Sequence, residues 1–231
     1  MRYIAFISVG KDSHNNAEYL VKSIKKTCVN FKIIQISRKI DKKIQHVDYK
    51  LEFEFEGNKF MVNKLQVLKT AYKKFGSLFF LGSDMMVIKN LDDIFDNLTN
   101  YDLIFTSRRS NFPISDEFRN VKFPEFIGKT VNDVMPFNAG FIGINSLKAI
   151  DFIEKTCKKL PERFHFWYGD QYAQKLTYDS NKFKILTLDY NYVKTPNSEN
   201  LYNATFESKK LSNDNIEFKS SVWVDGAVIS S

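Results

Sequence analysis

The chain has 231 residues, of which 43% are hydrophobic and 26% are charged, and its net charge is +7. This composition excludes a largely disordered protein, because it can fill one sizeable hydrophobic core. No apolar run approaches the ~20 residues that a membrane-spanning helix needs, which excludes a chain that crosses the bilayer as helices.

The positive charge comes mostly from lysines scattered in pairs, such as Lys25-Lys26 and Lys158-Lys159. We interpret these pairs as solvated helix ends and faces. A peripheral contact with an acidic membrane surface is the alternative. Without a dense basic run or zinc-finger spacing, specific nucleic-acid binding is not expected. The chain enters an apolar strand directly after Met1, and its two cysteines, Cys28 and Cys157, make no disulfide framework. We therefore expect a cytoplasmic protein with free thiols.

The first forty residues predict a strand, a helix and a second strand. Residues 3–8 are apolar and rich in β-formers, and residues 31–37 give the second strand. Between them, Asn15 or Asn16 is expected to cap a helix whose apolar residues lie on one stripe. A unit this short predicts two parallel strands joined by a right-handed crossover.

The middle of the chain continues this alternation. Phe53 and Phe55 alternate with glutamates, which predicts a half-exposed strand, and an amphipathic helix follows and ends at Gly76. An apolar strand then leads to Asp84, and a short helix over 91–98 precedes a strand over 101–106.

Periodicity fades between Ser107 and Pro136, where we expect a long functional or mobile loop. Its Arg108 and Arg109 are candidates to meet an acceptor phosphate or carboxylate, and a solvated loop is the equal alternative. A buried strand over 140–145, an amphipathic helix over 147–160 and a strand over 183–188 follow. No internal repeat or Pro-, Gly- or Ser-rich linker interrupts the chain. The predicted fold is therefore one α/β domain over residues 1–231, with a mostly parallel central sheet and helices on both of its faces.

Asp84 is the most informative residue of the sequence. It directly follows a buried strand, and in open α/β sheets ligands gather at the carboxyl ends of the strands. A carboxylate in this place can meet Mg²⁺ or Mn²⁺, which take hard oxygen ligands and bridge to phosphate. The alternative is a strand-end aspartate that caps the next turn.

The order of these segments resembles the GT-A nucleotide-diphospho-sugar transferases, most closely the glycosyltransferase family 8 type that includes glycogenin and bacterial galactosyl- and glucosyltransferases. Each stretch alone is of low specificity, but together they keep the family's order and spacing. The likeness rests on four stretches, namely Lys64-Leu65, residues 80–87 with their degenerate Asp-x-Asp motif, residues 136–145, and Tyr168-Gly169-Asp170-Gln171-Tyr172.

The resemblance implies a glycosyltransferase that moves a sugar from a UDP-hexose to an acceptor hydroxyl with retention of the anomeric configuration. The acceptor can be a glycan, a lipid-linked sugar or another hydroxyl compound. By the same resemblance, Asp170 and Gln171 are the catalytic candidates. The expected donor-binding residues are Ser8, Asp12, Lys64, Ser83, Asp84 and Asn138.

The chain departs from the family's pattern where a metal is expected. Gly82 stands in place of the first aspartate of the motif, and Trp223 replaces a metal-binding histidine. Asp84 and Asp225 are then the remaining candidates to hold Mn²⁺ or Mg²⁺. This departure leaves a second hypothesis open, a catalytically weak or metal-independent sugar-nucleotide-binding protein.

A nucleotidyltransferase is a third hypothesis, because such enzymes share the strand–helix–strand opening. They carry a Gly-rich basic loop after the first strand, of which Gly10-Lys11 is only a fragment. His165 in its aromatic surroundings is interpreted as a packing residue.

Overall fold

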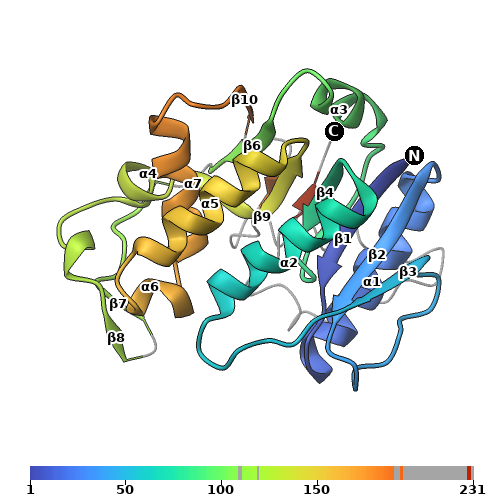
Figure 1. Cartoon of the computed structure of the whole chain (residues 1–231), viewed down its shortest axis with the longest axis horizontal. Coiled ribbons are helices and arrows are strands. Elements are labelled where there is room, and N and C mark those ends of the chain that lie inside the picture. Colours follow the sequence, from blue (N-terminus) through green and yellow to red (C-terminus); the bar gives the residue numbers. More distant parts are fainter. Residues whose placement is uncertain (109–110, 119, 190–192, 195–227, 230–231) are drawn as a thin grey trace.

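The computed structural model describes residues 1–108, 111–118, 120–189, 193–194 and 228–229. A central seven-stranded sheet has the strand order β10-β6-β9-β4-β1-β2-β3 (Figure 1). Helices cover both of its faces, which confirms the predicted fold class. The strands of this sheet are β1 (Arg2–Ile7), β2 (Phe31–Ser37), β3 (Tyr49–Glu52), β4 (Leu78–Leu81), β6 (Leu103–Ser107), β9 (Phe137–Ile144) and β10 (Ile185–Leu188).

Six of the seven strands run in one direction. β1 pairs in parallel with β2 and β4, and β10 pairs in parallel with β6. β9 is the exception, because it lies antiparallel between β4 and β6. The carboxyl ends of β1, β4 and β6 therefore meet the amino end of β9 at one edge of the sheet.

Two hydrophobic clusters fill the space on the two faces of the sheet. One face packs Ile4 and Phe6 against Leu20 and Ile24 of the first helix, and the other packs Ala5 against Leu65 of the second helix. Alternate residues of β1 thus enter opposite clusters, as the period of a strand requires. The helices are α1 (Lys11–Thr27), α2 (Phe60–Phe75), α3 (Asp92–Leu98), α4 (Val131–Val134), α5 (Leu147–Lys159), α6 (Arg163–Phe166) and α7 (Gly169–Asp179).

Two predicted boundaries are wrong in an informative way. α1 begins at Lys11 with Gly10 as its N-cap, so Asn15 and Asn16 lie inside the helix instead of capping it. The third strand ends at Glu52, so Phe53 and Phe55 follow the strand. Both phenylalanines still pack against the core, which explains why they alternate with glutamates.

The segment between β6 and β9 has its own small aromatic core. Phe123 and Phe126 are fully buried there, together with Phe164 of α6. The elements in this segment are only two to four residues long, so they leave no periodic pattern in the sequence. Besides α4 they are β7 (Glu117–Phe118), β8 (Val121–Lys122) and the 3₁₀ helix η1 (Pro124–Phe126).

A small second sheet lies next to the strand that follows Asp84. β5 (Met86–Val87) pairs in parallel with β12 (Val228–Ile229), which pairs antiparallel with β11 (Val193–Lys194). Val228 is opposite Met86 in this pairing. The backbone near the carboxyl end of the chain therefore returns to the segment that carries Asp84.

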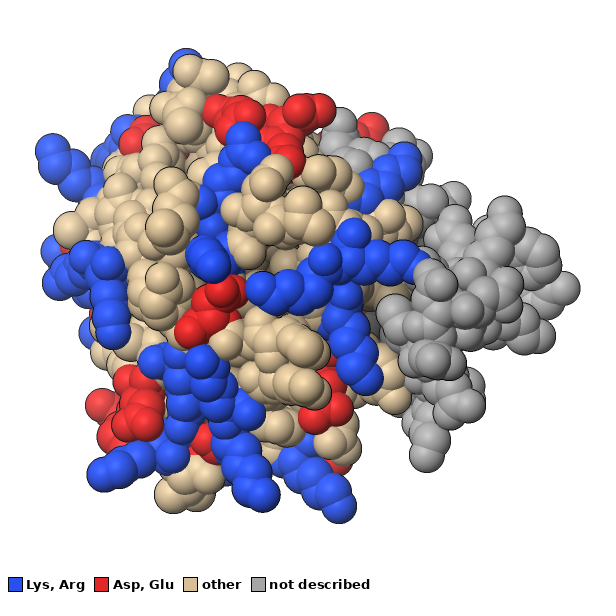
Figure 2. Space-filling model, turned by 90° about the vertical axis from the view of Figure 1, so that its right-hand side faces the viewer, with Lys and Arg blue, Asp and Glu red and all other residues tan. Residues whose placement is uncertain are grey.

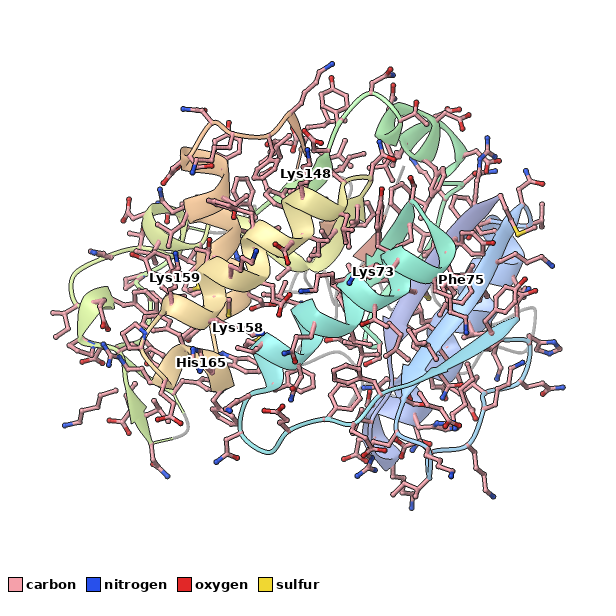
Figure 3. The ribbon with its side chains drawn as sticks, in the orientation of Figure 1. Lys73, Phe75, Lys148, Lys158, Lys159 and His165 are labelled. Carbon is pink, nitrogen blue, oxygen red and sulfur yellow. The ribbon has the colours of Figure 1, made fainter. Side chains whose placement is uncertain are left out.

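The lysine pairs lie mostly at the surface. Lys73 of α2 and Lys158 and Lys159 of α5 are in the last turns of their helices, where a cation interacts favourably with the helix dipole (Figure 3). On the face of the molecule that includes the β3 edge, Lys and Arg side chains predominate and acidic side chains lie among them in separate groups (Figure 2). Lys32, for example, forms an ion pair with Asp48 at 3.0 Å. Such mixed charge is typical of a solvated face.

In the part of the chain that is described, no helix combines the length and apolar character required to cross a membrane.

Candidate functional site

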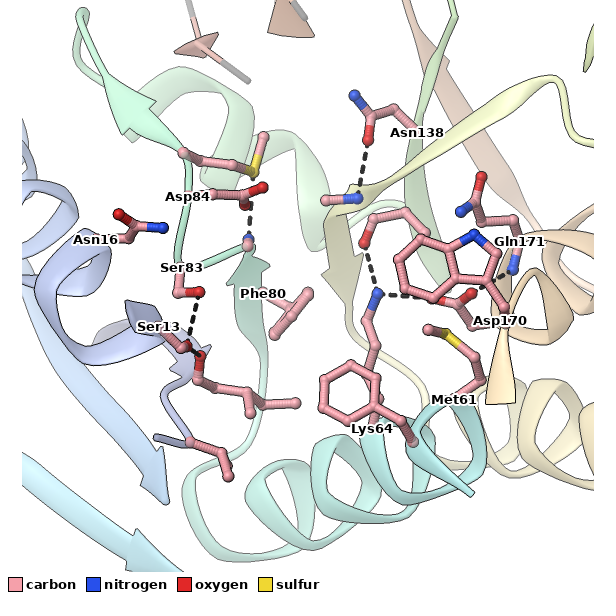
Figure 4. A pocket seen from close by; sticks show the side chains of 18 of the residues that line it. Ser13, Asn16, Met61, Lys64, Phe80, Ser83, Asp84, Asn138, Asp170 and Gln171 are labelled. Atoms are coloured by element: carbon pink, nitrogen blue, oxygen red, sulfur yellow. Dashed lines mark hydrogen bonds and ion pairs between the residues drawn. The ribbon is translucent and has the colours of Figure 1, made fainter. Parts of the chain in front are cut away.

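A cavity of about 640 Å³ opens at the sheet edge where β1, β4 and β6 end and β9 begins. Figure 4 shows this cavity from close by. It contains six of the residues that the sequence singled out. These are Lys64, Ser83, Asp84, Asn138, Asp170 and Gln171.

Three other predicted residues are not placed in the cavity. The Ser8 side chain is buried within the fold, and its hydroxyl has no hydrogen-bond partner among the described residues. Asp12 is exposed in the first turn of α1. Neither residue lines the cavity. Asp225, like Trp223, lies outside the described residues.

Two residues that were not expected from the sequence line the cavity where Ser8 and Asp12 do not. Ser13 and Asn16 of α1 line the cavity, and the hydroxyl groups of Ser13 and Ser83 lie 3.0 Å apart. Residues three apart in a helix share a face. Ser13 and Asn16 line the cavity because α1 starts at Lys11. The glycine at position 10, which adopts a φ of 81° before the helix, could have indicated this early start.

Lys64 and Asp170 form a buried ion pair at the base of the cavity. Lys64 Nζ donates to Asp170 Oδ2 at 2.7 Å and to the Ala139 carbonyl oxygen at 2.8 Å. The same ammonium lies 4.8 Å from the centre of the Phe80 ring. The side chains of Lys64 and Asp170 are only 9% and 2% exposed. Each of these buried charges is therefore neutralised by the other and hydrogen-bonded within the protein, as the burial of an ion requires.

Asp170 and Gln171 reach the cavity from the first turn of α7. The Asp170 carboxylate uses its second oxygen to accept from the Gln171 backbone N–H at 2.9 Å. Both oxygens of Asp170 are thus engaged. The carboxylate is therefore held in place by Lys64 and by the α7 backbone.

Arg108 is a wall residue for which the sequence left two interpretations open, a contact with an acceptor phosphate or carboxylate and a place in a solvated loop. It follows β6, is half-buried, and lines the cavity beside Gln171. Its Nε donates to the Phe137 carbonyl oxygen at 3.1 Å, and an Nη donates to Gln171 Oε1. A guanidinium group only donates, so this contact fixes the oxygen of the Gln171 amide on Arg108 and leaves the amide NH₂ as a donor. Burial lowers the pKa of Arg108, and the nearby charge of Asp170 opposes that shift.

The turn before α7 sets the position of Asp170. Tyr168 has φ of 64°, the left-handed conformation that a non-glycine residue seldom adopts. At Gly169, a Cβ atom would lie 2.2 Å from the Phe164 carbonyl oxygen. Only glycine allows α7 to begin this close to α6.

Asn138 lies at the amino end of β9, and its side-chain oxygen accepts from the Gly140 backbone N–H at 2.9 Å. This bond fixes the amide orientation, with the NH₂ group left to donate elsewhere. Asn138 and Gln171 thus both present amide donors near Asp170. Hydroxyl-rich ligands such as sugars are bound by donors of this kind.

Asp84 lies on the opposite side of the cavity from Asp170 and Gln171 (Figure 4), and Gly82 also lines the cavity. The Gly82 N–H donates to the Gly140 carbonyl oxygen at 2.7 Å, which ties β4 to β9 just before Asp84. A Cβ on Gly82 would lie 2.6 Å from Asp84 Oδ1. The Asp84 carboxylate therefore fills the space that a side chain at position 82 would take.

The described residues contain no group of three His, Cys, Asp or Glu side chains that could enclose a metal ion. Asp84 is one carboxylate in an open cavity. Mg²⁺ is commonly bound by one or two carboxylates, with substrate phosphates and water as its other ligands. The site fits a cation of this kind that arrives with a phosphate ligand.

Comparisons with known proteins give structural matches only. No family model matches the sequence, and no curated protein matches it. The glycosyltransferase GlyE of Streptococcus pneumoniae TIGR4 superposes with a TM-score of 0.52 at 17% identity, covering 99% of this chain and 54% of GlyE. The chain therefore spans about half the length of that protein.

Two further structures match along nearly their whole length. Mouse xyloside xylosyltransferase 1 has a TM-score of 0.52 at 12% identity, with coverage of 100% of this chain and 97% of the mouse chain. The galactosyltransferase LgtC, in complex with donor and acceptor sugar analogues, has a TM-score of 0.51 at 11% identity and coverages of 98% and 86%. These likenesses show the fold, and the chain has the GT-A fold. Membership of glycosyltransferase family 8 stays a prediction.

Proposed function

We propose that this chain is a glycosyltransferase that moves a hexose or related sugar from a nucleotide-sugar donor, a UDP-sugar, to an acceptor hydroxyl. The observation that carries the proposal is the shared cavity at the strand ends. It has the Asp84 carboxylate on one side and the Asn138 and Gln171 amides beside buried Asp170 on the other. The GT-A fold of the structural neighbours supports the same class of reaction.

The strand order suggests how a donor would lie. Ser13, Asn16 and Ser83 line the cavity at the β1 and β4 side, whereas Arg108 and Gln171 line it at the β6 side. We place the nucleotide at the first side and the sugar at the second, with the diphosphate near Asp84. Lys64 would add positive charge beneath the donor, although its ammonium already binds Asp170.

A cation would be held by Asp84, with Asp225 as the second ligand inferred from the sequence. When bound, Mn²⁺ or Mg²⁺ supplies positive charge that neutralises the diphosphate leaving group.

The chain's own residues would position the reacting sugar. The acceptor oxygen bonds to the anomeric carbon, the bond from that carbon to the diphosphate oxygen breaks, and the hydroxyl proton passes to the leaving group. The Asn138 and Gln171 amides orient the sugar hydroxyls. The Asp170 carboxylate stabilises the positive charge that develops on the ring, acting as a positioning and electrostatic residue. We propose retention of configuration, and a glycan, lipid-linked sugar or other hydroxyl compound as acceptor.

Titration of UDP and of a panel of UDP-sugars, with Mn²⁺, with Mg²⁺ and with EDTA, tests the proposal. We expect binding, slow donor hydrolysis, and a loss of about tenfold or more in affinity when Asp84→Asn removes the carboxylate. Asp93→Asn, an exposed residue of α3, is the matched control and should behave as wild type. If no donor is hydrolysed and none raises the melting temperature, the proposal is wrong.

Gly82 favours one second candidate, a sugar-nucleotide-binding protein that does not depend on a metal. With Gly82 in place of the first carboxylate, Asp84 is the one acidic residue left in the motif itself. Affinity that is equal with Mn²⁺ and EDTA, together with intact donor, would favour this candidate.

A further inference from the structure

Arg108 presents a positive charge to the cavity that the described protein does not neutralise. The other buried cation of the site, Lys64, is paired with Asp170. Arg108 donates only to a backbone carbonyl and to a neutral amide, and within the described ranges no carboxylate lies at ion-pair distance from it. Among the charged residues of the wall, Lys64 and Asp170 are therefore paired with each other, and Asp84 lies on the opposite side of the cavity from Gln171, the neighbour of Arg108.

The guanidinium group also has hydrogen-bonding capacity left. It carries five N–H donors, and the contacts to Phe137 and Gln171 use two of them. The two contacts hold the plane of the group in place, so the remaining donors are pre-oriented. A half-buried cation with unused donors is costly unless an anion is bound.

The position of Arg108 indicates which part of a ligand would supply this anion. Arg108 follows β6, and Ser13 and Asn16 belong to the helix that follows β1. In the sheet order, β9 and β4 separate β6 from β1. Three strand spacings correspond to about 14 Å. Arg108 therefore lies at the far end of the cavity from the proposed nucleotide end, next to Gln171.

We propose that Arg108 recognises an anionic substituent, a carboxylate or phosphate group, on a sugar bound beside Gln171. This inference rests on the proposed function, because it concerns the sugar end of the same cavity. The anion belongs either to the donor sugar, as in a nucleotide-linked hexuronate, or to the acceptor, as in a uronic acid or a sugar phosphate. The planar fork of Arg suits both groups bidentately.

The test is a comparison of anionic and neutral ligands by calorimetry. In the donor arm, UDP-hexuronates are compared with the matching UDP-hexoses, and UDP alone is titrated in parallel. In the acceptor arm, uronic acids and hexose phosphates are compared with the neutral sugars, in the presence of UDP. We expect wild type to prefer the anionic member in one arm by at least about tenfold.

Variants assign this preference to the guanidinium group. Arg108→Met should reduce the preference to within about twofold and leave the affinity for UDP unchanged. Arg108→Lys keeps the positive charge but lacks the planar, bidentate guanidinium group, so it should retain only part of the preference for the anionic ligand. Lys159→Met, a surface lysine at the end of α5, is the control for a change in net charge.

Four outcomes would overturn the inference, the last of them together with the proposed function. If wild type binds UDP-sugars but prefers no anionic ligand in either arm, the inference is wrong and the proposed function stands. The same holds if the preference for an anion survives Arg108→Met. If Arg108→Met weakens UDP itself as much as the anionic sugars, the guanidinium group serves the diphosphate instead. If wild type binds no nucleotide or nucleotide sugar, the proposed function fails with it.

Discussion

The Lys64 ammonium and the Asp170 carboxylate lie 2.7 Å apart, although the two residues are separated by 106 positions in the sequence. The pair joins α2 to the first turn of α7 and is buried on both sides. It fixes the part of α7 that enters the cavity.

Loss of the Lys64 charge should therefore destabilise the protein strongly. We expect Lys64→Met to lower the free energy of unfolding by about 3–5 kcal/mol, because Asp170 is left as a buried, unpaired charge. The double variant Lys64→Met/Asp170→Asn should recover much of this loss, since no charge remains buried. Urea unfolding measures both variants. Lys73→Met, exposed on the same helix, should stay within about 0.5 kcal/mol of wild type. A single variant as stable as wild type would show that the pair is solvated.

A methyl group at Gly169 should displace the start of α7. The added Cβ would lie 2.2 Å from the Phe164 carbonyl oxygen, and backbone atoms cannot yield as a flexible side chain does. We expect Gly169→Ala to cost about 1–3 kcal/mol or more in stability and to lower affinity for the donor sugar. Lys175→Ala, farther along α7, is the control. Unchanged unfolding and donor affinity in Gly169→Ala would contradict the close approach.

Substitution of Gly82 should lower the affinity for UDP by displacing the Asp84 carboxylate. A Cβ at position 82 would lie 2.6 Å from Asp84 Oδ1, so Gly82→Ala must turn that carboxylate away. We expect a fall of about tenfold in the affinity for UDP with Mn²⁺, measured by calorimetry. The same substitution should have little effect in an Asp84→Ala background, because the two changes act on one group. Additive effects in the double variant would show that Gly82 acts by another route.

Burial of Cys157 predicts a loss of stability at alkaline pH. Burial raises the pKa of its thiol to about 12, from an ordinary value of 9.0. Between these values the unfolded chain has released the proton and the folded chain has kept it, so stability falls as pH rises. The slope for this thiol is up to about 1.4 kcal/mol per pH unit.

Cys157→Ala provides the comparison for this slope. The variant is expected to be less stable at pH 7, because a buried side chain is shortened, and the difference from wild type should shrink above pH 9. Unfolding at pH 7, 9 and 10 measures it. A difference that stays constant would mean that the thiol ionises equally in both states.

The sequence predicted the site best where a motif lies at one end of a strand. Asp84 follows β4 and Asn138 begins β9, so the fold brings them to one cavity, although their chemical roles remain predictions. Asp170 and Gln171 needed the likeness to a family, because nothing local shows that α7 points into the sheet edge.

What the sequence could not predict depended on tertiary contacts. Arg108 lies in a segment without periodicity, and its contacts to Phe137 and Gln171 join residues 29 and 63 positions away. Lys64 was expected to bind the donor by resemblance to the family, and nothing in the sequence indicated its ion pair with Asp170 of α7. The small core around Phe123 and Phe126 gave no signal, because the elements that build it are too short for a pattern.

The reversed direction of β9 has a consequence for how such a protein can diversify. The first residues of β9 lie between the ends of β4 and β6. The half of the cavity with Asp84 therefore follows β4, and the half with Arg108 follows β6. Substitutions after β6 can change which sugar is bound in the half with Arg108, while the half with Asp84 stays unchanged. An engineer who wishes to exchange the transferred group would begin at Arg108 and leave Asp84 untouched.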